Sequence, residues 1–548
     1  MTGPAAQVAE PEGAPRAVRG IGRAAVLIGG LTVLARVVGL GRQIVFAHTV
    51  GNACLGTAYA TANQLPNIIY DIVLGGALTS IMVPVLARPA ERADRDPAAA
   101  REVSQISSAL LTWTVVILVP VSAALAIAAG PLVSLLLPLG RSGCPHADLV
   151  AVSSRMLVVF APQILLYGLA VVLYGILQAH RRFTAPALAP VLSSMVVIAA
   201  YLAYFSLRHS RATQLAGLSR PAELILSAGT TAGVAALVVT ALVPAWRLRL
   251  RLRPALRFPG GVARRARALA AVGISVLVAQ DASVLMVTWL ANGHGDSGAV
   301  VLYGYGWQLF TAAYAVLAIP IAISAFPVLS ASRGDAFDET AASSVRAAAM
   351  MSCLGAALLA GAAVPVSRVF ASDPAQVTQL ALTFAAFAPG LVGYGLAACL
   401  SRVLLADGRN RMAAMAMSAG WLLVIAADVA AVHLVSPRWV VPVLGLGNTA
   451  GLTVSGVALL AAVRRARGVA ALHGTVRAGA AGLTAALAGT GTAAALSAAV
   501  PATGIIANGL LVVAACACAG VVFGAIAYAL DGGDLRAVVA RARRRARR

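Results

Sequence analysis

The chain is poor in charged and aromatic residues and contains no lysine. Only 11% of its 548 residues are charged and 5% are aromatic, and all 42 of its basic residues are arginine. It also lacks metal-ligand spacings, a phosphate-binding loop and a catalytic triad, which argues against an enzyme and against an ATP-driven transporter. We therefore expect no catalytic activity and no bound cofactor. The N-terminal residues lack the short apolar core and cleavage site of a signal peptide.

Long hydrophobic runs dominate the chain instead. Hydrophobic residues make up 60% of the sequence, and the mean hydropathy is +0.87. Runs of about 18 or more apolar residues recur, and each can cross a bilayer as a helix. The pattern predicts an all-α polytopic membrane protein of about fourteen transmembrane helices. The predicted spans are 24–50, 58–87, 104–129, 150–179, 184–207, 222–246, 268–292, 298–330, 341–370, 376–405, 411–434, 438–463, 478–500 and 503–530.

The arginines are distributed unevenly around these spans. If the N-terminus is cytoplasmic, inner loops and tails hold 33 of the 42, outer loops and outer helix ends hold 7, and two lie within the first span. This bias follows the positive-inside rule and places both termini in the cytoplasm. The net charge of +23 is then explained by membrane topology, so we expect no nucleic acid partner.

The chain contains an internal repeat. Residues 160–170 read "FAPQILLYGLA" and residues 387–397 read "FAPGLVGYGLA", with "VPVLA" at 83–87 and "FPVLS" at 326–330 as a weaker match. Six spans separate the two stronger copies, so both run in the same direction. This predicts two parallel six-helix lobes around a central cavity plus two C-terminal helices, an arrangement found in alternating-access transporters. The predicted segments are a disordered cytoplasmic N-tail (1–23), an N-lobe (24–246), a basic cytoplasmic linker (247–267), a C-lobe (268–463), the last two spans with their preceding loop (464–530) and a basic cytoplasmic C-tail (531–548).

The first span carries two charges where lipid is expected. Arg36 and Arg42 are six residues apart, about 120° on an ideal helix, and "GLG" at 39–41 between them permits a bend. One interpretation is an anion site, because arginine suits phosphate. The alternative is an internal salt bridge of either arginine with Asp71 in the second span.

Two further acids, Asp281 and Asp428, lie in the seventh and eleventh spans with no basic residue in their own span. Such acids often bind a cation or a proton, and Thr449 and Thr453 could add oxygen ligands for Na⁺. The alternative is a hydrogen bond to a neutral side chain, such as Gln280 for Asp281. The coupling ion could thus be Na⁺ or H⁺.

Six cysteines are present, and two of them, Cys54 and Cys144, fall in predicted outer loops. These two cysteines could form a disulfide, and the sequence does not decide between a disulfide and two free thiols. The other four lie in spans, where we expect small apolar residues.

Three stretches resemble a known family. "ARVVGLGRQIVFAHTVG", "LPNIIYDIVLGGALTSIMVPVLA" and "ILQAHRRFTAPALAPVL" are similar to the MurJ/MviN family of lipid II flippases, within the superfamily that includes multidrug (MATE) and polysaccharide exporters. The resemblance implies fourteen helices, a multi-pass protein of the bacterial cytoplasmic membrane, and a role in peptidoglycan biosynthesis. It also implies that Arg36 and Arg42 line a cationic cavity and hold the diphosphate of an undecaprenyl-linked precursor, and that Asp281 and Asp428 match acids that bind sodium in some members.

The sequence departs from the family pattern around this arginine pair. The acid expected after the second arginine is Gln43, an expected cavity arginine is Asp71, and another in the eighth span is Gln308. An acid expected before the second span is replaced by Thr57, and another after Asp71 by Gly75.

Four functions remain open at this stage. The main hypothesis is flipping of lipid II by alternating access, driven by an ion gradient or the membrane potential. The alternatives are a divergent paralogue that flips another polyprenyl-diphosphate glycan, a MATE-like drug or cation exporter, and a non-transporting cell-wall scaffold. We expect membrane lipids as neighbours, a monomeric chain, and cell-wall synthesis proteins as further candidate partners.

Overall fold

The computed structural model describes residues 14–72, 86, 89–92, 96–139, 143–207, 215–248, 252–256 and 262–531. Regular structure in these ranges is helical throughout, which confirms the all-α class. Thirteen of the described helical segments are long and apolar enough to span a membrane. The second predicted span begins as a further helix, and its continuation at 73–85 lies outside the described residues, as do 1–13 of the N-tail and 532–548 of the C-tail.

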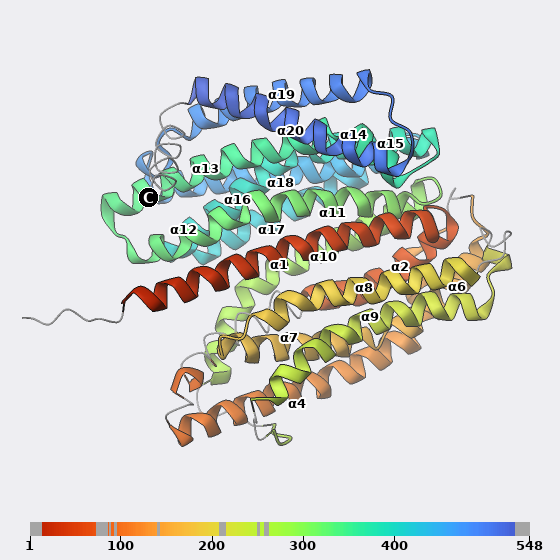
Figure 1. Ribbon diagram of the computed structural model, residues 1–548, viewed down its shortest axis with the longest axis horizontal. Coiled ribbons are helices and arrows are strands. Elements are labelled where there is room, and N and C mark those ends of the chain that lie inside the picture. The colour runs from red at the N-terminus through yellow and green to blue at the C-terminus, as the bar shows by residue number, and fades with distance from the viewer. Residues whose placement is uncertain are drawn as a thin grey trace, which may run out of the picture.

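The helices form two bodies that lie one above the other in Figure 1, with the last two helices at one edge. The N-lobe comprises α1 (Ala14–Thr49), α2 (Cys54–Ile72), α4 (Pro97–Ile127), α5 (Ala129–Leu136), α6 (His146–Phe160), α7 (Gln163–Ala179), α8 (Thr184–Leu207) and α9 (Arg220–Trp246). The C-lobe comprises α10 (Val262–His294), α11 (Ala299–Leu317), α12 (Ile319–Ala331), α13 (Gly334–Gly361), α14 (Ala363–Phe370), α15 (Pro374–Phe387), α16 (Gly390–Ala406), α17 (Asn410–Val432) and α18 (Val440–Arg467). The two further helices are α19 (Thr475–Ala499) and α20 (Gly504–Leu530), which pack on α13.

Most predicted spans agree with these helices to within a few residues, and the fifth, 184–207, coincides with α8. Four helices begin six or more residues before the predicted spans: α1 at Ala14, α4 at Pro97, α10 at Val262 and α13 at Gly334. Helix α1 begins at Ala14, inside the segment predicted as a disordered tail, and α10 begins at Val262, inside the predicted linker. Both segments are rich in alanine and arginine, which are strong helix formers, so the helices continue past the apolar runs that marked the predicted starts.

The internal repeat is preserved in the backbone. In the N-lobe copy a helix ends at Phe160 and resumes at Gln163, and in the C-lobe copy a helix ends at Phe387 and resumes at Gly390. The continuations end at Ala179 and Ala406, which are also equivalent positions of the two copies. A proline that lacks an amide donor sits in each break, which explains why both copies interrupt at the same position.

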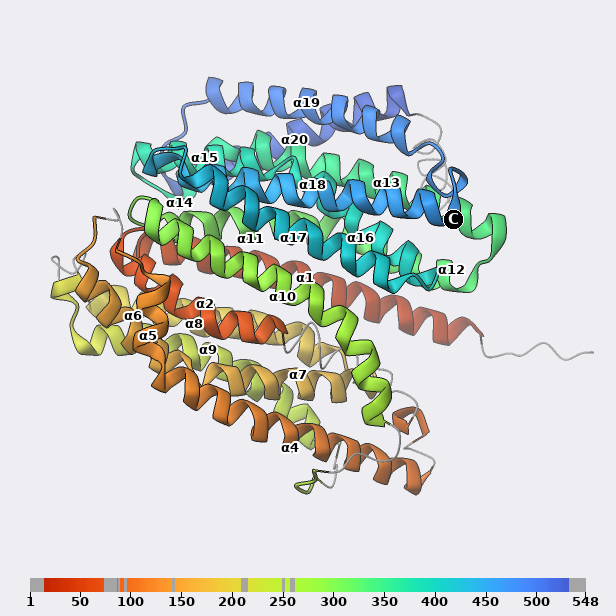
Figure 2. The same cartoon turned by 180° about the vertical axis from the view of Figure 1, so that it is seen from behind.

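Figure 2 places the disulfide-bonded loops at one end of the bundle and the arginine-rich loops at the other. We call these the disulfide end, which carries residues 50–53, 143–146 and 295–298, and the arginine-rich end, which carries 180–183, 332–333 and 407–409.

Within the C-lobe, α17 and α18 pack closely through glycine. A Cβ on Gly420 would lie 2.6 Å from Ser455 Cβ, and a Cβ on Gly451 would lie 2.5 Å from the carbonyl oxygen of Gly420. Small residues let helix backbones approach in this way inside membranes. Because Asp428 and Gly447 lie on the same pair of helices, this crossing also positions the acid described below.

We therefore expect Gly420→Ala and Gly451→Ala to destabilise the chain by about 1–3 kcal/mol each, because the added methyl overpacks the crossing. Gly491→Ala is the matched control, since no atom of the described residues lies within 4 Å of its Cβ position. Thermal unfolding of the detergent-purified protein measures the difference, and equal melting temperatures for all three variants would contradict the packing argument.

Candidate functional site

The two lobes are joined at the disulfide end by a set of neutral hydrogen bonds. Asn52 lies at its centre, since its Nδ2 donates to the Phe370 carbonyl at 2.9 Å and its Oδ1 accepts from the Tyr305 hydroxyl at 2.8 Å. The other contacts join Thr57 Oγ1 with Gly298 N, Asn292 Nδ2 with Thr61 Oγ1 and with the Leu136 carbonyl, and His48 Nε2 with the Val369 carbonyl. Most of these polar groups are buried, so the lobes meet closely at this end.

The Cys54–Cys144 disulfide, which the sequence left open, is formed at the same end. It ties the start of α2 to the loop before α6. Ser297 of the C-lobe lies against both sulfur atoms, with its Oγ 3.7 Å from Cys54 Sγ and 3.3 Å from Cys144 Sγ. The disulfide thus holds the N-lobe surface on which the C-lobe turn at 295–298 rests.

The arginines of the first span lie further along α1. The helix runs without interruption through Gly39 and Gly41, so the two side chains keep different directions. Arg36 is exposed, whereas Arg42 is half-buried and its Nε has no hydrogen-bond partner among the described residues. Arg42 lies within electrostatic reach of Tyr167 of the N-lobe.

Asp71, near the end of α2, is exposed and faces the opposite lobe. It lies within electrostatic reach of Asp281 and Tyr394, both of the C-lobe. Neither Arg36 nor Arg42 forms an ion pair with it in the described part of the chain. The internal salt bridge considered from the sequence is therefore not formed there. Arg42 and Asp71 both lie within electrostatic reach of Tyr167, and we call the region between the lobes that these two charges share the interlobe space.

Gln43 and Gln308, two of the departures from the family pattern, contact each other. The Gln43 Nε2 of α1 donates a hydrogen bond to the Gln308 Oε1 of α11. Both side chains are partly buried. Their hydrogen bond joins the two lobes at a point further from the disulfide end than the contacts of Asn52 and Gly298. Positions where the family pattern predicts an acid and an arginine thus form one neutral pair.

Asp428 of α17 lies in a buried polar cluster of the C-lobe. It is 0% exposed, and neither carboxylate oxygen has a hydrogen-bond partner in the described part of the chain. Gly447 of α18 leaves room for it, since a Cβ there would collide with Asp428 Oδ1. The next residue, Asn448, donates to the Tyr303 hydroxyl at 2.7 Å, while its own Oδ1 has no described partner. Sequence reasoning missed Asn448 and Tyr303, because neither carries a charge or a motif that marks it.

Asp281 of α10 does not share that cluster. The ring centroids of His294 and His433 are 4.9 Å apart, so these two residues lie at the same height along α10 and α17. Asp281 precedes His294 by 13 residues and Asp428 precedes His433 by 5, so at 1.5 Å per residue the two acids lie about 12 Å apart along parallel helices. Asp281 is buried, and its Oδ2 also lacks a partner among the described residues.

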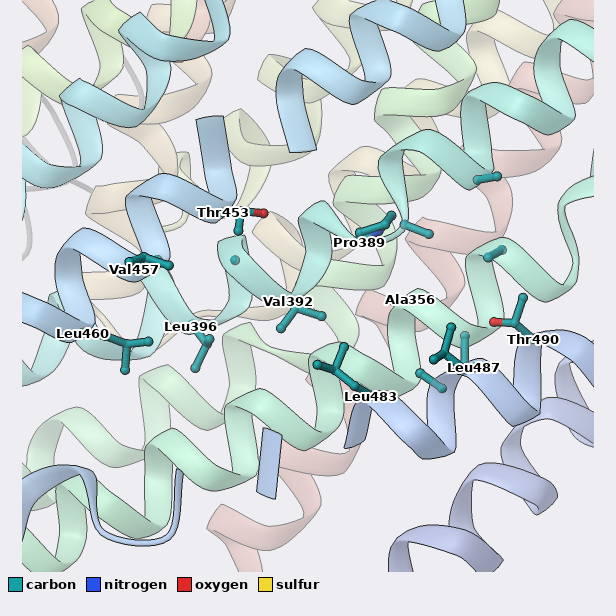
Figure 3. Close-up of a pocket in the computed structure, with 17 residues that line it drawn as sticks. Ala356, Pro389, Val392, Leu396, Thr453, Val457, Leu460, Leu483, Leu487 and Thr490 are labelled. Atoms are coloured by element: carbon teal, nitrogen blue, oxygen red, sulfur yellow. The ribbon is translucent and has the colours of Figure 1, made fainter. Parts of the chain in front are cut away.

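The two threonines grouped with these acids are placed elsewhere, which corrects the predicted ligand set. Thr449 Oγ1 donates to the Ala386 carbonyl at 2.5 Å, and Thr453 points into an apolar cavity of about 410 Å³ among α13, α16, α18 and α19 (Figure 3). On an α-helix these positions lie about 200–240° from Gly447, which faces Asp428. The spacing in the sequence brought them to the same helix but not to the same face.

An apolar groove of about 530 Å³ lies beside the arginine helix. Leu40 and Ile44 of α1 line it together with residues of α11, α13, α14 and α20, such as Val316, Leu359 and Val513. Arg36 and Gln43 share this side of α1, about 40–60° around the helix from Leu40. A polar and an apolar surface are therefore adjacent on the same helix.

Two lobes of repeated topology, closed together at one end and holding unpaired charges between them, define a polytopic membrane transporter. A family model described as "Lipid II flippase MurJ" matches residues 46–513, and the chain belongs to this family.

Curated relatives carry the same description. The lipid II flippase MurJ of Burkholderia cenocepacia is 27% identical over 386 residues, which cover 68% of this chain and 70% of the relative. The probable lipid II flippase MurJ of Synechocystis sp. is 29% identical over 248 residues, 44% of each chain.

Solved structures confirm the fold. A lipid II flippase MurJ in its inward closed conformation superposes with a TM-score of 0.69 at 15% identity, covering 92% of this chain and 99% of that one. An inward-facing multidrug MATE transporter gives a TM-score of 0.62 at 15% identity, over 80% and 94% of the two chains. The predicted family and the two-lobed fold are both confirmed.

The glutamine pair offers a test of the interlobe contact. Gln43→Glu alone should weaken it, because an unpaired carboxylate is left in a partly buried site, and we expect a loss of about 1–3 kcal/mol in thermal stability. Adding Gln308→Arg should restore most of that loss by forming an ion pair. Additive effects of the two substitutions would show that the side chains do not interact.

Proposed function

We propose that the chain is a lipid II flippase of the bacterial cytoplasmic membrane and has no catalytic activity. The observation that carries the proposal is Arg42, a half-buried guanidinium whose Nε has no partner and which forms no ion pair in the described part of the chain. A charge at this depth requires water or an anion, and the planar donor fork of arginine suits a diphosphate. Family membership and the names of the relatives support lipid II as the molecule that carries this diphosphate.

The proposed orientation follows from charge. The arginine-rich end faces the cytoplasm, where basic residues accumulate, and both termini lie on that side. The disulfide end then faces the oxidising side of the membrane, which agrees with a Cys54–Cys144 bond. Because the lobes meet closely at the disulfide end, the proposed route into the interlobe space starts from the cytoplasmic side.

The proposed transport cycle uses both surfaces of α1. The headgroup enters the interlobe space, its diphosphate binds Arg42 and Arg36, and the undecaprenyl chain stays in contact with the bilayer along the apolar groove beside Leu40 and Ile44. Rocking of the lobes opens the disulfide end and releases the headgroup outside. The same binding chemistry fits a divergent paralogue that carries another undecaprenyl-diphosphate glycan.

The coupling ion in this proposal binds at Asp428. Its two carboxylate oxygens and the adjacent Asn448 Oδ1 are acceptors without a described donor, so the buried cluster fits a bound cation or proton better than it fits an empty anionic state. Asp281, about 12 Å away along the helices, is a second acid that could carry the ion between the interlobe space and Asp428. The proposed ions are Na⁺ or H⁺.

A functional prediction concerns the arginines. Arg42→Ala and Arg36→Ala should abolish or strongly reduce rescue of a bacterium depleted of its own flippase, because a diphosphate ligand is lost. Arg42→Lys should rescue partly, since it keeps the charge without the bidentate fork. Arg333→Ala is the control, because the described hydrogen bonds of this exposed side chain go to carbonyls of its own loop.

Failure of the well-expressed parent to rescue such cells would contradict the lipid II assignment. Rescue that survives both alanine variants would favour a non-transporting scaffold that recruits cell-wall proteins. Raised resistance to cationic dyes would favour a drug exporter, although Arg42 opposes that reading because it repels a cationic substrate.

A second prediction concerns the ion. Na⁺ should raise the melting temperature of the purified parent, and Asp428→Asn should remove this effect, because ligand binding to the folded state adds stability. Asp373→Asn is the control, since this helix-capping acid lies outside the cluster and asparagine caps equally well. No response to Na⁺ combined with stabilisation on acidification would identify a proton instead.

A further inference from the structure

The apolar cavity of about 410 Å³ in the C-lobe is a crevice between two membrane helices. Residues of α18 and α19 form its two walls, and residues of α13 and α16 form its floor (Figure 3). Helix α19 packs on α13, α18 packs on α16, and α13 packs on α16, so the walls stand on a continuous floor. Val457 of α18 and Leu487 of α19, which lie on the walls, are 59% and 75% exposed. The crevice therefore opens toward the lipid that surrounds these spans.

The lining of this crevice suits a hydrocarbon chain. Its side chains are aliphatic apart from those of Thr453 and Thr490, and its floor is rich in alanine. The walls extend over residues 453–460 and 483–490, so the crevice runs about 10 Å along the helices. The hydrocarbon of one leaflet is about 15 Å thick, so an acyl chain that lies along α18 fills the crevice lengthwise.

An arginine lies beyond the crevice on the same face of α18. Arg464 follows Val457 by seven residues, so the two lie within about 20° of each other around the helix and about 10 Å apart along it. Arg467, three residues further on, pairs with Asp338 and Asp407, which places this end of α18 at the arginine-rich end of the bundle. Arg464 is exposed and forms no ion pair or hydrogen bond in the described part of the chain. It is therefore available to an anion beside the crevice.

The crevice and the arginine match the two parts of a phospholipid. The arginine-rich end faces the cytoplasm in the proposed orientation, and the cytoplasmic leaflet of a membrane carries anionic lipids, whose headgroups bind basic pockets between helices. A phosphate on Arg464 places the glycerol backbone near Leu460, one helical turn away, and an acyl chain of the same lipid then enters the crevice past Val457. Arginine suits this phosphate because its planar donors form two hydrogen bonds to it.

We propose that the crevice between α18 and α19 binds one anionic phospholipid of the cytoplasmic leaflet, with an acyl chain in the cavity and the phosphate on Arg464. The choice of leaflet rests on the proposed orientation of the chain, whereas the lipid site itself does not. The site is separate from the groove beside Leu40 and Ile44, which residues of α1, α11 and α20 line. A bound lipid fills the space between α18 and α19 and thereby stabilises the packing of α19 on the C-lobe.

The test measures lipid binding to the detergent-purified full chain by native mass spectrometry, with phosphatidylglycerol and phosphatidylethanolamine that carry the same acyl chains. We expect Arg464→Gln to lower the affinity for phosphatidylglycerol about fivefold, because the charge that attracts the anionic headgroup is lost. The affinity for phosphatidylethanolamine should change less, since its headgroup has no net charge. Arg465→Gln is the matched control, because Arg465 is exposed at the same depth but lies about 80° around α18 from Val457.

A second pair of variants tests the acyl chain. Val457→Trp places a large ring at the mouth of the crevice and should lower the affinity for both lipids about three- to tenfold, because less of the acyl chain is buried. Val454→Trp is the control, since Val454 is an exposed valine of the same helix that does not line the crevice. Both substitutions are at exposed positions, so the melting temperatures of the two variants should stay close to that of the parent.

Three results would overturn the site. Equal losses for Arg464→Gln and Arg465→Gln would show a diffuse attraction to the end of α18. Equal affinities of Val457→Trp and Val454→Trp would show that no acyl chain occupies the crevice. Competition by undecaprenyl diphosphate that Val457→Trp abolishes would assign the crevice to a prenyl chain. None of these measurements involves transport, so a failure of the proposed flippase function leaves their outcome unchanged.

Discussion

The cost of leaving a charged side chain without a partner inside a bilayer governs this structure. Arg42, Asp71 and Asp428 all lie within the helical bundle, and none forms an ion pair in the described residues. Isolated charges of this kind cost several kcal/mol in apolar surroundings unless water, a ligand or a proton compensates them. In the proposed function, the substrate and the coupling ion supply the charges that these side chains lack.

The duplicated fold carries different charges in its two copies, and both intramembrane arginines of the first span lie in the N-lobe. The same interrupted helices, with breaks at Pro162 and Pro389, build equivalent walls in both lobes. The N-lobe wall carries Arg36 and Arg42, whereas the C-lobe carries Asp281 and Asp428. In the proposed function, the N-lobe copy binds the anionic headgroup and the C-lobe copy binds the small cation or proton. Divergence of side chains on a conserved backbone is how such a transporter can couple two different ligands.

Much of this arrangement could be predicted from the sequence, because it depends on patterns that the chain shows locally. Apolar length indicated the spans, and the match of 160–170 with 387–397 indicated the lobes and the repeated helix break. Contacts across the lobes could not be predicted in the same way. Gln43 and Gln308 are far apart in the chain and uncharged, so no periodicity or charge pattern pairs them. Thr449 and Thr453 were predicted to join Asp428 in one ion site. Both lie on α18, but their side chains point away from the face of α18 that contacts Asp428.

The neutral character of the interlobe contacts has a consequence for transport. Neutral hydrogen bonds such as those of Asn52, Asn292 and the glutamine pair contribute about 0.5–1.5 kcal/mol each, whereas hydrogen bonds to charged groups contribute about 1.5–3 kcal/mol. Reversing a 99:1 population of two states requires about 5.5 kcal/mol of differential binding. A handful of neutral bonds is of this size, so the proposed binding of an ion at Asp428 and of the headgroup at Arg42 would together suffice to open the disulfide end. An acid at position 43 and an arginine at position 308 would add a charged contact to the same interface. Opening the interface would then require more binding free energy from the ion or from the substrate. The neutral pair in this chain therefore favours a gate that opens with a weaker driving force.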